Sequence, residues 1–192
     1  MAVLTKLEQL REISLDQCGF VTTKQATNAG LVHADLSVMV SRGRLNRVAH
    51  GVYRVPQVAE TSQDQYQLAV LWTGSEQACL SHETALAIRD ISDVNPQRIH
   101  LTVPRKRRIR RNGGELYVVH KEDLDPRDIV WWEGIPTVSV STAIRQCIES
   151  GVATYLIKQA LRQARGTSLL QPKEHAHLTT MVKARDDAKP AA

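Results

Sequence analysis

Apolar positions in the first forty residues recur at the three- and four-residue spacing of helices. The spacing predicts three short helices: one over 5–16, one that begins at Thr22 or Thr23, and one after Gly30. A threonine hydroxyl can cap the second helix, and glycine suits the left-handed turn into the third. The predicted buried face of the third helix comprises Leu36, Met39 and Val40.

Alternating positions follow, and they predict two strands over 45–49 and 52–55 that join at His50-Gly51. Pro56 ends this module. Helix, glycine turn, helix and basic hairpin succeed one another in the order of a winged helix-turn-helix, which places one helix in the DNA major groove. We therefore expect a DNA-binding domain over 1–57.

The pattern from 58 to 186 predicts an α+β domain with a small mixed sheet, and 187–192 predict a disordered tail. In the strand over 128–132, Trp131 and Trp132 must face opposite sides, one of them into the core. The expected strands are 98–103, 115–120 and 128–132. The expected helices are 62–73, 81–91, 141–150, 152–165 and one from Pro172. The inward face of the helix over 152–165 is expected to be Tyr155, Leu156, Gln159 and Ala160.

Charge narrows the choice of partner. The 192 residues carry a net charge of +5, and the pI near 9.3 favours a polyanion. Basic and acidic blocks alternate along the chain: residues 1–56 carry +3 and 104–121 carry +6, whereas 57–103 carry −4. The three cysteines form no C-x-x-C pair, so we expect reduced thiols and a cytoplasmic protein, without signal peptide or membrane segment.

Small polar side chains on the third helix can approach base edges, and basic side chains around it can contact phosphates. The helix face offers His33, Ser37, Val38 and Ser41. The phosphate contacts are assigned to Lys24, Arg42 and Arg44, and the wing contacts to Arg47, His50 and Arg54. The alternative is a winged helix that binds another protein.

A second basic segment comprises Arg105, Lys106, Arg107, Arg108, Arg110 and Arg111. Six cations in seven residues favour a contact with a polyanion or an acidic partner over a merely solvated hairpin tip.

The sequence contains few residues with the spacing that a catalytic or metal site requires. Ser81, His82 and Glu83 are adjacent and so point apart on a helix, which favours Ser81 as an N-cap. His100 and His120 could lie on neighbouring strands, but no third ligand has suitable spacing. No phosphate-binding glycine motif is present. We expect no enzyme, metal or cofactor.

The order of these pieces resembles the AbiEi-type antitoxins, the abortive-infection antitoxins of bacterial type IV toxin–antitoxin systems. The resemblance rests on Gly19–Ala26, Ala29–Leu31, Val40–Arg54, Leu80–Leu86, His100–Pro104 and Gly134–Ser139. Acidic Asp35 and the serine at position 41 depart from the family pattern.

This resemblance implies a transcriptional repressor of its own operon that binds inverted repeats and takes part in phage defence. It also implies that the protein counteracts a nucleotidyltransferase-like toxin, with or without a stable complex. The N-terminal module would serve repression, and the C-terminal domain would serve antitoxicity. By position, the DNA-facing residues would be Lys24, Ser37, Ser41, Arg42, Arg44, Arg47 and His50. Two alternatives remain: an interaction module that does not bind DNA, and a nucleic-acid-processing enzyme.

Overall fold

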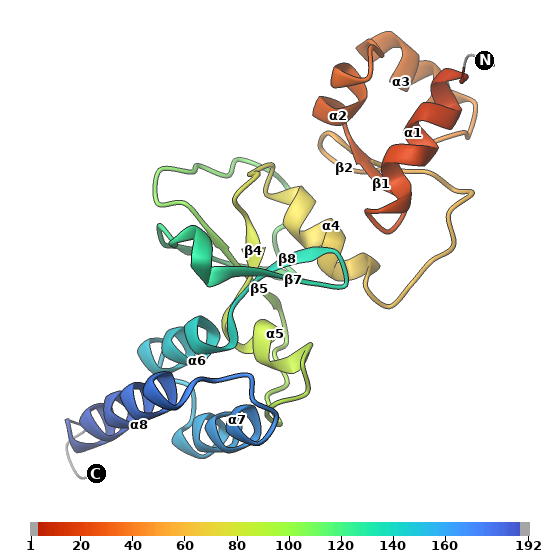
Figure 1. Ribbon diagram of the computed structural model, residues 1–192. Helices are drawn as coiled ribbons and strands as arrows, with labels where there is room; N and C mark the ends of the chain where they lie inside the picture. The colour runs from red at the N-terminus through yellow and green to blue at the C-terminus, as the bar shows by residue number, and fades with distance from the viewer. Residues whose placement is uncertain (1–3, 189–192) are drawn as a thin grey trace.

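The computed structural model describes residues 4–188 and arranges them as two units, each with its own sheet and core (Figure 1). The predicted α+β class is confirmed. The first unit contains α1 (Lys6–Leu15), β1 (Phe20–Thr22), α2 (Thr23–Asn28), α3 (His33–Ser41), β2 (Asn46–Ala49) and β3 (Val52–Arg54). Its sheet is antiparallel in the order β1-β3-β2.

Helix ends in the first unit follow from local hydrogen bonds. Thr22 caps α2 by accepting from the Gln25 N–H, and Gln25 accepts from the Thr22 N–H in return. Gly30 has a φ of +85°, and the Leu31 N–H donates back to the Ala26 carbonyl at 3.0 Å. This glycine cap closes α2 and turns the chain into α3, as predicted.

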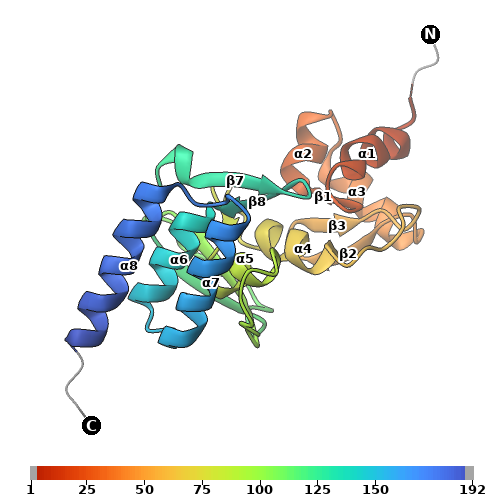
Figure 2. The same cartoon turned by 60° about the horizontal axis from the view of Figure 1, so that its bottom comes forward.

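The second unit has a mixed sheet in the order β6-β5-β4-β8-β7. Helix α4 covers one face, and the other helices lie on the opposite face (Figures 1 and 2). The helices are α4 (Asp64–Trp72), α5 (His82–Ala87), the 3-10 turn η1 (Pro126–Asp128), α6 (Val140–Glu149), α7 (Thr154–Gly166) and α8 (Pro172–Asp187). The strands are β4 (Cys79–Leu80), β5 (Ile99–Val103), β6 (Tyr117–Lys121), β7 (Ile129–Trp132) and β8 (Ile135–Val138).

Alternation along the strands divides the core into two layers. Leu80, Leu101 and Val103 pack with α4, whereas Cys79 packs with α5 and α6 on the other face. The strand pair β5–β6 is parallel, so the chain between them must cross over rather than form a hairpin. The crossover, residues 104–116, places the basic run against α4.

Several expectations need correction. Tyr155 is 70% exposed, because the buried row of α7 is Ile157, Ala160, Leu161 and Ala164. Helix α7 includes Gly166, and α5 ends at Ala87 rather than near 91. Helix α8 continues to Asp187, the first residue of the predicted tail, whereas 189–192 lie outside the described residues.

Candidate nucleic-acid interface

Helix α3 presents its predicted polar face to solvent. His33, Ser37 and Ser41 are exposed one turn apart, and Val38 beside them is 45% exposed. The buried side of the helix is anchored by Leu36, which is 1% exposed, with Met39 and Val40 half-buried. The face therefore has the small, polar surface that close approach to base edges requires.

The serine hydroxyls on this face already donate within their own helix. Ser37 Oγ donates to the His33 carbonyl at 3.1 Å, and Ser41 Oγ donates to the Val38 carbonyl at 2.9 Å. Their oxygen lone pairs remain able to accept. In this rotamer each serine can therefore read a base donor without giving up its helix hydrogen bond.

A second glycine cap fixes the arginines that follow α3. Gly43 has a φ of +65°, its N–H donates to Val40, and the Arg44 N–H donates to the Met39 carbonyl at 2.9 Å. Arg42 and Arg44 thus leave a rigid helix end rather than a flexible loop. Both side chains are exposed.

Asp35 does not present a free negative charge at the start of α3. Its carboxylate accepts from the Val32 N–H at 3.0 Å and pairs with Lys6 Nζ at 2.7 Å. The Lys6 and Val32 hydrogen bonds lower the pKa of Asp35. Asp35, which departs from the family pattern, therefore caps the start of α3 and has its charge balanced by Lys6.

The wing is a β2–β3 hairpin held against α2. Its tip accepts a hydrogen bond from the Thr23 N–H at the Gly51 carbonyl, 2.9 Å away. A register shift between Arg47 and Ala49 places a bulge at Val48, which is 40% exposed. Arg47 and His50 are exposed on this hairpin.

Arg54 is a correction to the predicted wing contacts. Its side chain is 9% exposed and donates to Asp64 Oδ2 at 2.5 Å and to the Cys18 carbonyl at 3.0 Å. It also donates to the Val58 carbonyl at 3.1 Å and lies over the Phe20 ring. The guanidinium thus joins β3 to the start of α4, and it cannot reach DNA.

Lys24 is exposed, but it pairs with Glu76 of the second unit. Both side chains are more than two-thirds exposed, at 68% and 76%. Solvent screens such an exposed pair, so a phosphate could replace the carboxylate. The phosphate contact of Lys24 stays a prediction.

The second basic segment is divided by the structure. Arg107, Ile109 and Arg111 face inward, and Ile109 packs into the core beneath α4. Arg107 donates to the Thr73 and Gly74 carbonyls, and Arg111 donates to the Trp72 carbonyl at 2.7 Å. These two side chains cap the C-terminal end of α4 and are not available to a partner. The exposed members are Arg105, Lys106, Arg108 and Arg110.

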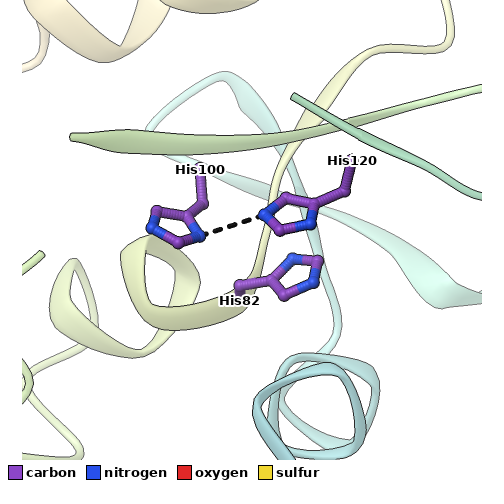
Figure 3. A group of neighbouring side chains, drawn as sticks. All are labelled: His82, His100 and His120. Carbon is purple, nitrogen blue, oxygen red and sulfur yellow. Dashed lines mark hydrogen bonds between the residues drawn. The ribbon is translucent and has the colours of Figure 1, made fainter. Parts of the chain in front are cut away.

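Sequence reasoning missed a group of three histidines. His82, His100 and His120 lie together, with one candidate ligand atom each within 4.8 Å of the others (Figure 3). The expectation that no third ligand would be near was wrong, because α5 brings His82 onto the sheet. Burial lowers the pKa of His82 to about 3 and that of His120 to about 4. The charges of His120 and His100 lower the pKa of His82 further, and the charge of His100 lowers that of His120.

Ser81 precedes α5, as expected of an N-cap, but its hydroxyl makes no cap hydrogen bond. It lies instead 3.0 Å from His82 Nδ1. The predicted capping role of its side chain is therefore wrong.

The helices α1 to α3, the glycine turn between α2 and α3, and the β2–β3 hairpin define the first unit as a winged helix-turn-helix. A family model described as a transcriptional regulator, AbiEi antitoxin, matches residues 8–56 and confirms the resemblance over that segment. No curated protein matches the chain. The crystal structure of the RV2827C protein from Mycobacterium tuberculosis is similar at a TM-score of 0.42 and 14% identity, over 96% of this chain and 78% of that chain. Among the described residues, no helix is long and apolar enough to cross a membrane.

Proposed function

We propose that the protein is a DNA-binding autorepressor and antitoxin of a type IV toxin–antitoxin operon. In this proposal α3 reads operator repeats in the major groove, and Arg42, Arg44 and Arg47 hold the phosphates. The observation that carries it is the exposure of the polar face of α3, of Arg42 and Arg44 just after that helix, and of Arg47 on β2. Within residues 4–188 none of the three forms an ion pair or a side-chain hydrogen bond.

The family match supports the regulatory half of the proposal, because the matched segment, residues 8–56, covers α2 to β3 and all of α1 except its first two residues. The antitoxin half rests on the resemblance and assigns the second unit to counteracting a nucleotidyltransferase-like toxin. Its exposed basic side chains, Arg105, Lys106, Arg108 and Arg110, are the surface proposed for a polyanion or an acidic partner.

A salt series tests the phosphate contacts. Binding of the full chain to its own upstream DNA and to a scrambled duplex is measured by anisotropy. Arg44→Ala together with Arg47→Ala should reduce the salt slope by about one to two on both duplexes, because each phosphate contact releases a counterion. The matched control removes two exposed arginines of α7, Arg162→Ala with Arg165→Ala. Equal slopes for both double variants would contradict the assignment.

Base reading is tested on α3. Ser37→Ala or Ser41→Ala should lower the preference for operator over scrambled DNA by up to about tenfold, because base contacts alone carry sequence information. Non-specific affinity should stay the same. An equal loss on both duplexes would show that the serines do not read bases.

The antitoxin half is tested separately by co-expression with the toxin encoded beside this chain. Replacement of the four exposed basic residues of 105–110 by serine should abolish rescue and leave repression intact. Rescue by that variant would remove this surface from the proposal, while the DNA-binding result would stand.

A further inference from the structure

The three histidines are held on rigid elements rather than on loops. His100 lies on β5 and His120 on its parallel neighbour β6, where His120 pairs in register with Thr102. His82 begins α5 on the same face of the sheet (Figure 3). Its φ of +52° is rare for a side chain of this kind, and its N–H donates to Gln146 Oε1 at 3.2 Å. The surrounding structure therefore holds His82 in this position.

A neighbouring side-chain oxygen faces one ring nitrogen on two of the histidines, at hydrogen-bond distance for His82 and slightly farther for His100. Ser81 Oγ lies 3.0 Å from His82 Nδ1, and Glu83 Oε2 lies 3.6 Å from His100 Nε2. Outer partners of this kind orient metal-binding histidines and fix which nitrogen is free. The nitrogens left over are His82 Nε2 and His100 Nδ1, and the latter lies 3.1 Å from His120 Nε2.

His100 Nδ1 and His120 Nε2 face each other, so a proton or a metal ion must satisfy the two nitrogens. If the outer partners hold the protons of His82 Nδ1 and His100 Nε2, then His100 Nδ1 carries a lone pair toward His120 Nε2. The metal-free chain can satisfy it only by placing a proton on His120 Nε2. A metal ion to one side of the line between these nitrogens would bind both lone pairs at the usual Zn–N length of about 2.0–2.1 Å. The His120 proton would move to Nδ1 by exchange with water, without net proton release.

We propose that His82 Nε2, His100 Nδ1 and His120 Nε2 bind a divalent transition-metal ion of the zinc class. Three imidazoles are a ligand set that such ions accept, with a fourth position for water. Without the ion, His82 and His120 stack with ring centroids 3.5 Å apart. The His82 ring must therefore turn about its side-chain torsions, and away from its present contact with Ser81, to direct Nε2 at the ion. A cleft of about 490 Å³, lined by both His82 and His120, supplies the fourth position with solvent.

The two carboxylates that line this cleft, Glu122 and Glu149, both accept hydrogen bonds from Arg145. Glu122 accepts from Arg145 at 2.6 Å and from Gln146 at 2.7 Å. It therefore remains an outer residue, and the site keeps three protein ligands. The ion would join α5 to the strands β5 and β6, which makes the site a clamp within the second unit.

The experiment is a titration of the full chain, stripped with EDTA, against Zn²⁺ and Co²⁺. We expect one equivalent of Zn²⁺ to bind with a Kd of about 1 μM or tighter, and Co²⁺ to give the visible absorption of a four-coordinate site. Zn²⁺ should raise the Tm by about 5 °C or more, because it binds only the folded chain. Long-range ¹H–¹⁵N spectra of the unaltered protein should show shifts at the three named nitrogens.

Variants locate the ion. His100→Gln and His120→Gln should each weaken binding by at least about 100-fold, whereas the double variant His175→Gln with His177→Gln on α8 should bind as before. Absence of stoichiometric binding by the unaltered chain would overturn the proposal. So would loss of binding in the α8 variant alone, or spectra in which the triad nitrogens do not shift, and these results need no altered triad to fold.

Discussion

The two units treat similar polar residues in opposite ways. In the winged unit, Arg42 and Arg44 after α3 and Arg47 on β2 are exposed. In the second unit, Arg107 and Arg111 fold inward onto the end of α4, and three histidines lie between α5 and the sheet. The first arrangement leaves charge free for a partner, and the second uses polar groups to hold the unit together. Arg54 is intermediate between these two cases. The sequence predicts it in the wing, but its ion pair with Asp64 places it at the junction between β3 and α4.

The largest expected effect on stability comes from the substitution Arg54→Met. It leaves Asp64 without its cation and removes the donors to the Cys18 and Val58 carbonyls. Breaking a buried pair by removing one partner costs about 3–5 kcal/mol. Urea unfolding should show that loss, and Arg47→Met, on the exposed neighbouring strand, should change stability by less than about 0.5 kcal/mol. Equal effects would contradict the junction role.

Acid should destabilise the second unit through its histidines. Their pKa values lie below the unfolded value near 6.5, because burial disfavours the charged rings. The unfolded chain therefore binds more protons below about pH 6.5, and stability falls as the pH drops from there toward about 4. The slope approaches about 1.4 kcal/mol per pH unit for each histidine that stays neutral.

This dependence is measured by urea unfolding in EDTA between pH 7.5 and 4.5. The charged groups that act on the triad are Glu83 on α5, Arg98 before β5, Glu122 after β6, and Arg145 on α6. His120→Gln should flatten the slope, whereas His50→Gln on the exposed wing should leave it unchanged. Identical slopes for the two variants would remove the triad as the cause.

The smallest expected effect separates the inward and outward cations of the basic run. Arg111→Met removes the hydrogen bond to the Trp72 carbonyl and should cost about 1–2 kcal/mol of stability. Arg108→Met, three residues earlier and exposed, should cost less than about 0.5 kcal/mol. Urea midpoints for the two variants measure the difference, and the reverse order would contradict the division.

Sequence patterns predicted the winged unit well because its signals are local. The threonine cap of α2, the glycine turn that follows α2, and the hairpin each depend on residues within a few positions. Strand β1 was missed because three residues are too few for an alternation. Strand β8 was missed because it contains Pro136, which usually argues against a paired strand.

The parts that could not be predicted depend on distant contacts. Nothing near Arg54 in the sequence indicates Asp64 as its partner, and its position in the second predicted strand of the hairpin suggested the wing instead. The inward cations of the basic run could have been found, since Arg107, Ile109 and Arg111 share one side of an alternating segment. The histidine triad could not, because its members are separated by whole elements and meet only when β5 pairs with β6 and α5 docks.

The two-residue strand β4 has a consequence for synthesis on the ribosome. It is the central strand of its sheet, paired with β5 on one side and with β8 on the other, where Leu80 pairs with Thr137. All sheet pairings of the winged unit lie within residues 20–54, so they can form early. β4, by contrast, keeps an unpaired edge until 135–138 have emerged. The nascent second unit is thus exposed to mispairing for about as long as the ribosome needs to add the intervening sequence.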